Sequence, residues 1–398
     1  MEKMPKKTFY VLLVAAFSAM LGMGVISPFL PELVKKHNAN GFWMGMIFAG
    51  YAFSRAVIMP MVGKASDRFG KKVFVVTGLF LFALISLLYP WAHNVYNLTF
   101  VRMLHGLSAG MVIPIVMAYA GEMAEEGKKG EVTGSVTMMF YMGLAAGPLL
   151  GGVINHFFGF AAIFYAMSFL GIIAFLVVLF FLPDLKSPVP GSERESFAFN
   201  KIIKYDFIKG VLIIAITMTL LMTVFLSFLP SLAESVNVNP DHIGLILSFG
   251  IFIAGMLQVP LGKLSDKLTK PGRLLQIGMG VSVSMTAIFV MPLCPDFHWL
   301  MAAGGLLGTG VGISVPALMN ISVGVGEKVG MGTWMGITNT ATSIGVMVAP
   351  LVSGMIMDAL GIDDVFYVLG TVAVFGGLCF LYYIRKRLSG DIIIRTAP

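Results

Sequence analysis

Two arginines lie inside long apolar stretches of the sequence, where a charge is costly. Arg55 precedes Gly63 by eight residues, roughly 12 Å along a helix, which puts it near the middle of the stretch 42–63. An arginine in the centre of an apolar span costs about 3 kcal/mol even on permissive scales, so it must face water, a carboxylate, carbonyls or a ligand. We expect Arg55 to contact an anionic group or a coupling partner; the alternative is a packed salt bridge between helices.

Arg102 and His105 lie three residues apart, which puts them close to one face of a helix. Arg102 is near one end of its apolar stretch, so its side chain could instead extend to the polar boundary. His105 has a side chain that can titrate near neutral pH, with a hydrogen-bonded packing role as the alternative. The pair is a second candidate site.

Further polar residues could either line a central cavity or join helices through hydrogen bonds. Glu32 and Glu234 lie at equivalent ends of the first and seventh apolar stretches. They could form an outer gate or a protonation pair, or they could simply be solvated. The remaining candidates for cavity positions all lie in the second half of the chain: Gln258, Asn320, Asn339 and Thr340.

The elements that hold these residues must be membrane-spanning helices. Of the 398 residues, 57% are apolar and 12% charged, with a mean hydropathy of +0.89, whereas soluble domains are about 25% charged. Apolar runs of about 20 residues, each long enough to cross a bilayer core, recur along the chain. We therefore predict an all-α membrane protein with twelve spans: 8–34, 42–63, 73–92, 97–120, 132–156, 159–182, 208–235, 242–262, 273–293, 297–322, 332–357 and 364–384.

Basic residues are distributed asymmetrically between the connecting segments. With the N-terminus inside, 23 of the 27 Lys and Arg residues fall on the inner side. The positive-inside rule then predicts a multi-pass protein of the cell membrane with both termini in the cytoplasm. The net charge of +7 is explained by this topology, and no nucleic-acid partner is expected. Cys294 and Cys379 are too few and too far apart for a disulfide framework or a metal site.

The sequence repeats itself once. Gly63-Lys64-x-Ser66-Asp67 recurs as Gly262-Lys263-x-Ser265-Asp266 at an offset of 199, and Gly and Pro residues after position 100 recur at an offset of 202. We predict two six-helix halves, 1–182 and 210–398, joined by a cytoplasmic linker at 183–209. The counterparts of Arg55 and Arg102 are Ala254 and Gly304, so both charges break the repeat.

Several segments resemble signatures of the major facilitator superfamily. The segment from Gly63 to Lys72 is similar to the cytoplasmic signature G-x-x-x-D-R-x-G-R/K-R/K, and Arg102 to Gly106 to the R-x-x-x-G signature. Gly143 to Gly152 resembles the antiporter signature, and the first span is similar to that of tetracycline and multidrug exporters. The resemblance covers essentially the whole chain and indicates the twelve-helix drug:proton antiporter branch.

The resemblance implies a secondary transporter that works by alternating access, is driven by the proton gradient without a cofactor, and exports drugs or lipophilic small molecules as a monomer. It also implies proton coupling for Arg102. A cytoplasmic lock is implied for Gly63, Asp67, Arg68, Gly70, Lys71 and Glu122. A close-packed hinge that seals one half against the other is implied for Gly143, Gly147, Pro148, Gly151 and Gly152.

One departure from that branch leaves alternatives open. Many such exporters have an acidic residue in the core of the first span, but 17–27 has none, and the ninth span has none either. A carrier for an organic anion, a sugar or another polar metabolite is therefore the second hypothesis. A membrane enzyme or receptor is the third, although no metal triad, nucleophile signature or phosphate loop supports an enzyme.

Overall fold

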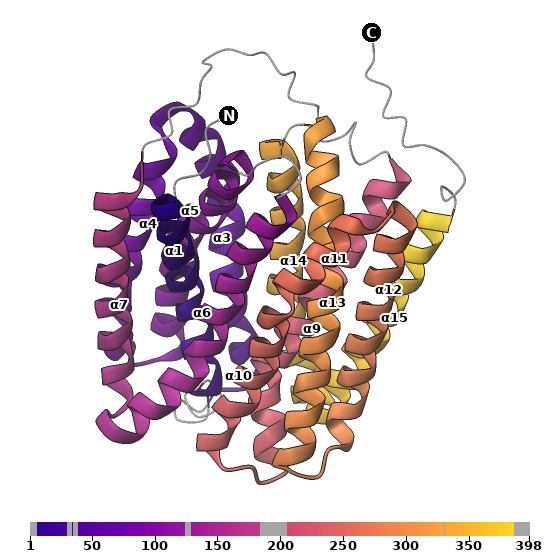
Figure 1. Ribbon diagram of the computed structural model, residues 1–398. Helices are drawn as coiled ribbons and strands as arrows, with labels where there is room; N and C mark the ends of the chain where they lie inside the picture. Colours follow the sequence, from indigo (N-terminus) through magenta and orange to yellow (C-terminus); the bar gives the residue numbers. More distant parts are fainter. Residues whose placement is uncertain are drawn as a thin grey trace.

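The computed structural model describes residues 6–29, 34, 39–123, 129–183, 205–329 and 331–385. Within these residues, twelve helical segments are long and apolar enough to cross a membrane. Figure 1 shows two groups of helices side by side, the first from indigo to magenta and the second from rose through orange to yellow. The twelve predicted spans are confirmed as helices.

The first half contains six long helices and two short 3₁₀ turns. In chain order these are α1 (Lys6–Val25), η1 (Ser27–Phe29), α3 (Gly41–Phe69), α4 (Lys71–Ser86), η2 (Tyr89–Trp91), α5 (Val95–Met123), α6 (Lys129–Phe158) and α7 (Phe160–Phe181). The second half follows the same order: α9 (Asp206–Ser235), α10 (Pro240–Met256), α11 (Gln258–Lys267), α12 (Lys270–Val290), η3 (Met291–Leu293), α13 (Phe297–Val329), α14 (Met331–Ala359) and α15 (Ile362–Arg385).

Helix boundaries differ from the prediction at several ends, and two of the differences concern the cytoplasmic signature and the eighth span. We placed the cytoplasmic signature in a loop after Gly63, but α3 continues to Phe69 and the chain reverses at Gly70 alone, whose φ is 89°; glycine adopts that conformation without a steric penalty. The span predicted at 242–262 is interrupted at Leu257. Pro260 follows at the start of α11, and its missing N–H accounts for this break.

The internal repeat is present in the packing as well as in the sequence. A Cβ placed on Gly106 of α5 would overlap the Tyr51 carbonyl oxygen of α3, and one on Gly308 of α13 would overlap the Gly250 carbonyl oxygen of α10. The glycines are 202 residues apart and the carbonyls 199, the same two offsets found in the sequence. The two halves therefore repeat the same helix crossing.

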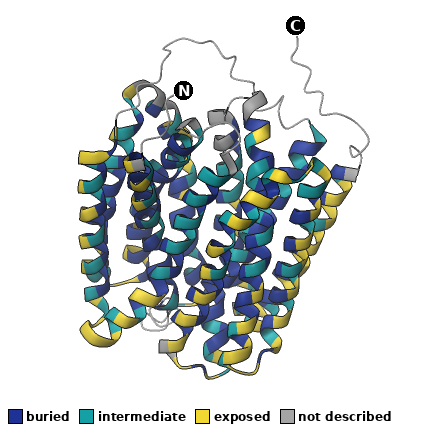
Figure 2. Cartoon of the chain, in the orientation of Figure 1, coloured by how far each residue is buried: buried dark blue, intermediate teal, exposed yellow. Residues whose placement is uncertain are grey.

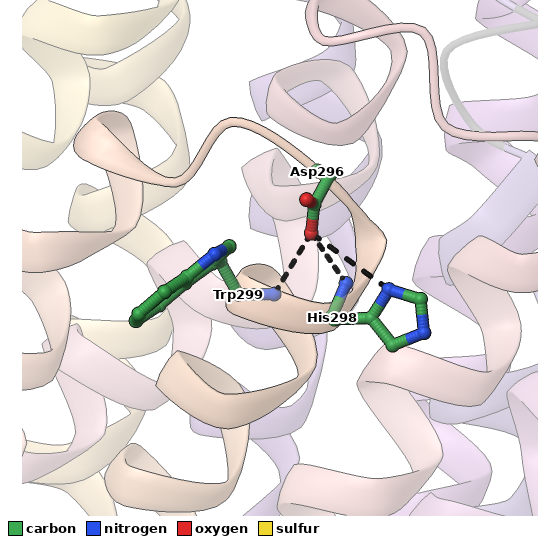
Figure 3. Close-up of polar contacts among 3 residues, drawn as sticks. All are labelled: Asp296, His298 and Trp299. Atoms are coloured by element: carbon green, nitrogen blue, oxygen red, sulfur yellow. Dashed lines mark hydrogen bonds and ion pairs between the residues drawn. The ribbon is translucent and has the colours of Figure 1, made fainter.

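The start of the fourth helix in each half is capped in the same way. The Asn94 side chain accepts a hydrogen bond from the Asn97 N–H (2.8 Å). At the equivalent place, Asp296 accepts from the N–H groups of His298 (2.9 Å) and Trp299 (3.1 Å), as Figure 3 shows. Such side chains satisfy N–H groups that have no partner within the helix, which defines where α5 and α13 begin.

The two halves meet along two seams, where α3 packs on α14 and α6 packs on α10. The seams are related by the repeat: Gly45 of α3 lies against the Pro350 carbonyl oxygen, and Gly244 of α10 lies against the Pro148 carbonyl oxygen. By contrast, α7 and α15 lie at the outside, at opposite edges of the molecule in Figure 1. Their exposed residues are yellow in Figure 2, and the apolar ones among them suit contact with lipid.

Candidate functional site

Arg55 lies on the seam between α3 and α14. Its Nη2 donates a hydrogen bond to Ser343 Oγ of the other half (3.3 Å), its side chain is buried, with 8% exposed, and its Nε has no hydrogen-bond partner. Among the described residues, no carboxylate lies within ion-pair distance of this guanidinium. The interhelix salt bridge that we considered as an alternative is therefore not observed in this part of the chain.

Tyr51, four residues before Arg55 on α3, lies between the two buried arginines. Its ring centroid is 5.8 Å from Arg55 Cζ and 4.9 Å from Arg102 Cζ. Both cations can interact with the negative face of the ring at these distances. The Tyr51 hydroxyl is buried without a hydrogen-bond partner. Sequence reasoning missed Tyr51, although its counterpart in the repeat is Gly250, which marks it as asymmetric in the same way as the arginines.

Arg102 is fully buried, and this overturns the alternative that its side chain extends to the polar boundary. Its Nη1 donates to the Gly22 carbonyl oxygen of α1 (3.3 Å), and Phe48 lies 5.6 Å from its Cζ. The aromatic rings face the guanidinium inside the first half, and its Nε and Nη2 have no hydrogen-bond partner among the described residues. Gly22, Phe48 and Tyr51 all belong to that half, whereas Arg55 reaches across the seam.

His105 lies in the same interior, next to α4 and η2. Its Nδ1 is 2.9 Å from the Tyr89 hydroxyl, its ring packs against Phe82 with centroids 4.6 Å apart, and its Nε2 has no partner. A Cβ on Gly22 would lie 3.1 Å from the imidazole. Gly22 thus leaves room for His105, and its carbonyl oxygen accepts from Arg102, so the two residues meet α1 at the same place.

Asn320 is not part of this group, which differs from the cavity position that we expected. Its Nδ2 donates to Asp266 Oδ1 (2.5 Å) in the second copy of the cytoplasmic signature. Arg273 Nε donates to the Ser265 carbonyl oxygen beside it (2.9 Å). A carboxylate at the end of α11 requires a polar partner, and Asn320 provides it, whereas Arg273 binds backbone carbonyl oxygens of the same turn.

One ion pair that sequence reasoning missed joins the halves at the end of the α6–α10 seam. Lys263 Nζ of α11 lies 3.2 Å from Glu131 Oε1 of α6, with both side chains about half exposed. The repeat is the sequence signal that could have pointed to Lys263, because this residue is the second-half equivalent of Lys64 in the cytoplasmic signature. The pair therefore lies where the second copy of the signature faces the first half.

The first copy of the signature can be described only in part. Gly63 and Gly70 are placed, and Lys71 is buried at the start of α4. The side chains of Asp67, Arg68 and Glu122 lie outside the described residues, as does Glu32. The lock that we expect from them stays a prediction.

The glycines of the antiporter signature correct one of our expectations. Gly143, Gly147 and Gly151 do lie on one face of α6, but that face packs on α1 of the same half, against Phe17, Gly24 and Phe29 in turn. They do not seal one half against the other. Pro148 supplies that contact through its carbonyl oxygen and Gly244, because it lies on a different face of α6. A Cβ on Gly152 would meet nothing within 4 Å.

The other predicted cavity residues are dispersed. Gln258 is buried, and its Nε2 donates to the Ala254 carbonyl oxygen (2.9 Å), so its amide supports the break between α10 and α11. Asn339 and Thr340 are partly exposed on α14, and Asn339 lies one turn before Ser343. Glu234 is partly exposed in the last turn of α9. The structure therefore brings Asn339 near Arg55 and leaves Gln258 and Glu234 elsewhere.

Comparison with known proteins gives consistent matches over most of the chain. The Major Facilitator Superfamily model matches residues 12–210 and again 211–393. An uncharacterized MFS-type transporter of Methanocaldococcus jannaschii is 26% identical over 369 residues, covering 91% of this chain and 94% of the relative. The quinolone resistance protein NorA of Staphylococcus aureus is 28% identical over 364 residues, covering 88% and 90%.

Two further matches agree with these. Multidrug resistance protein 2 of Bacillus subtilis is 28% identical over 394 residues, covering 96% of each chain. The crystal structure of the human organic anion transporter MFSD10 superposes with a TM-score of 0.73, covering 95% of this chain and 100% of that one at 15% identity. At that identity the superposition supports the fold alone.

Proposed function

The chain belongs to the Major Facilitator Superfamily, and from that premise we propose that it is a secondary transporter that exports lipophilic small molecules by alternating access. The observation that carries this proposal is the similarity, over nearly the full length, to two transporters named for drug resistance. We further propose that it lies in the cell membrane with both termini in the cytoplasm, because 23 of the 27 basic residues then lie inside. A monomeric state is part of the same proposal.

The seams support movement of one half against the other. On one seam, Asp358 of α14 accepts hydrogen bonds from the N–H groups of Gly41 and Phe42 at the start of α3 (2.8 and 3.1 Å). On the other, Ser248 Oγ donates to the Ala145 carbonyl oxygen (2.7 Å). Apart from such contacts, the seams consist of close helix packing at small residues, which suits rigid-body rocking of two bundles.

We propose that the proton gradient supplies the energy. Neither α1 nor α12 contains an acidic residue, so the coupling group must lie elsewhere. His105, which is buried beside Arg102, is the candidate inside the first half, and Glu234 is the candidate at the end of α9. The signature residues Asp67, Arg68 and Glu122, together with the pair Glu131–Lys263, would stabilise the state that is closed to the cytoplasm.

Transport into proteoliposomes tests this function. Purified protein is reconstituted, an inside-acidic pH gradient is imposed, and uptake of a radiolabelled quinolone is followed. Gradient-driven accumulation that a protonophore abolishes is expected. Uptake equal to that of protein-free liposomes, for the quinolone and for a lipophilic cation alike, would exclude the exporter; uptake that is insensitive to the protonophore would exclude proton coupling only.

A further inference from the structure

We propose that Arg55 and Ser343 form a recognition site for the carboxylate of the transported molecule, so that the substrates are lipophilic acids and not cations. The inference rests on the export function proposed above and names its substrate class. It starts from one observation: a buried guanidinium on the seam between the halves has a serine as its only hydrogen-bond partner among the described residues.

The unused donor of Arg55 has the right geometry for an anion. Nη2 donates to Ser343 and carries two N–H groups. One of them points to the same side of the guanidinium as the Nε–H, which is buried and unpaired. A carboxylate can accept both of these hydrogen bonds at once, which is the arrangement that arginine favours. A buried cation without a counter-charge carries a desolvation cost that such a ligand would offset.

Ser343 adds a contact from the other half. Its hydroxyl accepts from Arg55, so the hydroxyl proton is left to donate, and no acceptor for that proton is found among the described residues. An acid bound here would touch α3 and α14 together. Because a ligand shifts a conformational equilibrium only through different contacts in the two states, a site divided between the halves suits a substrate that drives their movement.

The helices around the seam carry no acidic residue at the depth of Arg55. No carboxylate of theirs therefore pairs with Arg55 there or offers a site for a cationic substrate. Besides each other, α3 and α14 pack on α4, α5, α9, α13 and α15. The acidic residues of these seven helices each lie within about one turn of a helix end: Asp67, Glu122, Asp206, Glu234, Glu327, Asp358, Asp363 and Asp364. Arg55 lies near the middle of α3, so the charge at that depth is positive.

Arg102 strengthens this positive potential without contacting the ligand. Its Cζ is 4.9 Å from the centroid of Tyr51, whose ring also lies 5.8 Å from Arg55 Cζ. Arg102 is fully buried and hydrogen-bonded to Gly22 in the first half. Two cations flank one aromatic side chain, and no described carboxylate lies within ion-pair distance of either. This favours an anion next to Arg55, the one that lies on the seam.

The test compares a quinolone carboxylic acid that has no basic amine with its methyl ester, which lacks the negative charge and carries one added methyl group. Both are radiolabelled, and each is measured for binding in detergent and for uptake into proteoliposomes. The variants are Arg55→Gln, Arg55→Lys and Ser343→Ala. Ser248→Ala is the matched control, because it removes a buried serine that bridges the other seam.

We expect Arg55→Gln to weaken binding of the acid at least about tenfold, the effect of losing one hydrogen bond to a charged group, with ester binding changed less than about twofold. Arg55→Lys should weaken binding of the acid to an intermediate extent, because lysine keeps the positive charge but loses the two parallel N–H donors of the guanidinium. Ser343→Ala should weaken acid binding more than ester binding, and Ser248→Ala should affect both equally.

Equal losses for acid and ester in Arg55→Gln, or no loss for the acid, would overturn the proposal. Size-exclusion profiles identical to those of the unsubstituted protein confirm that the variants are folded. If the unsubstituted protein transports neither probe nor a lipophilic cation, the exporter function is wrong; binding of the acid in detergent, with its dependence on Arg55, then still decides whether the anion site exists.

Discussion

The crossing of α3 with α5 and the crossing of α10 with α13 share one backbone geometry and differ in chemistry. In the first half Gly106 packs on the Tyr51 carbonyl, and Tyr51, Arg55 and Arg102 surround the crossing. In the second half the equivalent residues are Gly250, Ala254 and Gly304, and a Cβ on Gly250 would lie only 2.7 Å from the Gly304 carbonyl oxygen.

The comparison separates scaffold from function. The glycine on α5 or α13 is kept in both halves because the helices approach closely there. The large polar side chains are present in only one half, where they occupy space that the other half closes by backbone contact. Fold and function can therefore be altered separately in this region.

The largest effect should come from the shared glycines. In Gly106→Ala and Gly308→Ala, the new Cβ overlaps a carbonyl oxygen of the crossing helix, so we expect the free energy of unfolding to fall by about 1–3 kcal/mol. Thermal inactivation of purified protein measures this. Gly121→Ala on α5 and Gly324→Ala on α13 are matched controls, since a Cβ there meets nothing within 4 Å. Equal stability of all four variants would contradict the shared crossing.

A smaller effect is expected from Arg102→Met. The variant keeps the apolar contacts with Phe48 and Tyr51 and removes a buried charge, so thermal stability should not fall. Loss of the positive potential should weaken binding of an acidic quinolone by about threefold, less than in Arg55→Gln. A larger loss than in Arg55→Gln would place the ligand at Arg102 and not at the seam.

The smallest effect should come from the ion pair between Glu131 and Lys263. Both side chains are about half exposed, and such pairs contribute about 0–1 kcal/mol, so Glu131→Gln should change the transport rate by less than about twofold. Glu131→Lys should slow transport further through repulsion, and adding Lys263→Glu should restore it. Failure of that exchange to restore the rate would show that the two residues do not act as a pair.

The sequence predicted the twelve helices and the repeat because apolar length and the spacing of Gly and Pro depend on each half alone. It also identified Arg55 and Arg102, whose burial in apolar spans is unusual by itself. It could not predict Ser343 as the partner of Arg55, or that Gly143, Gly147 and Gly151 face α1. Those contacts depend on how each helix is rotated and on how the halves are placed against each other, and neither is encoded in a local pattern.

The central claim is that Arg55 lies at a substrate site between halves that open alternately, and its accessibility tests this most directly. In Arg55→Cys, on a background with Cys294 and Cys379 replaced by serine, a membrane-impermeant thiol reagent is added from each side of oriented vesicles. We expect reaction from both sides, because each side of the membrane opens to this position in turn. A cysteine that is inert from both sides, with and without a pH gradient, would contradict the account.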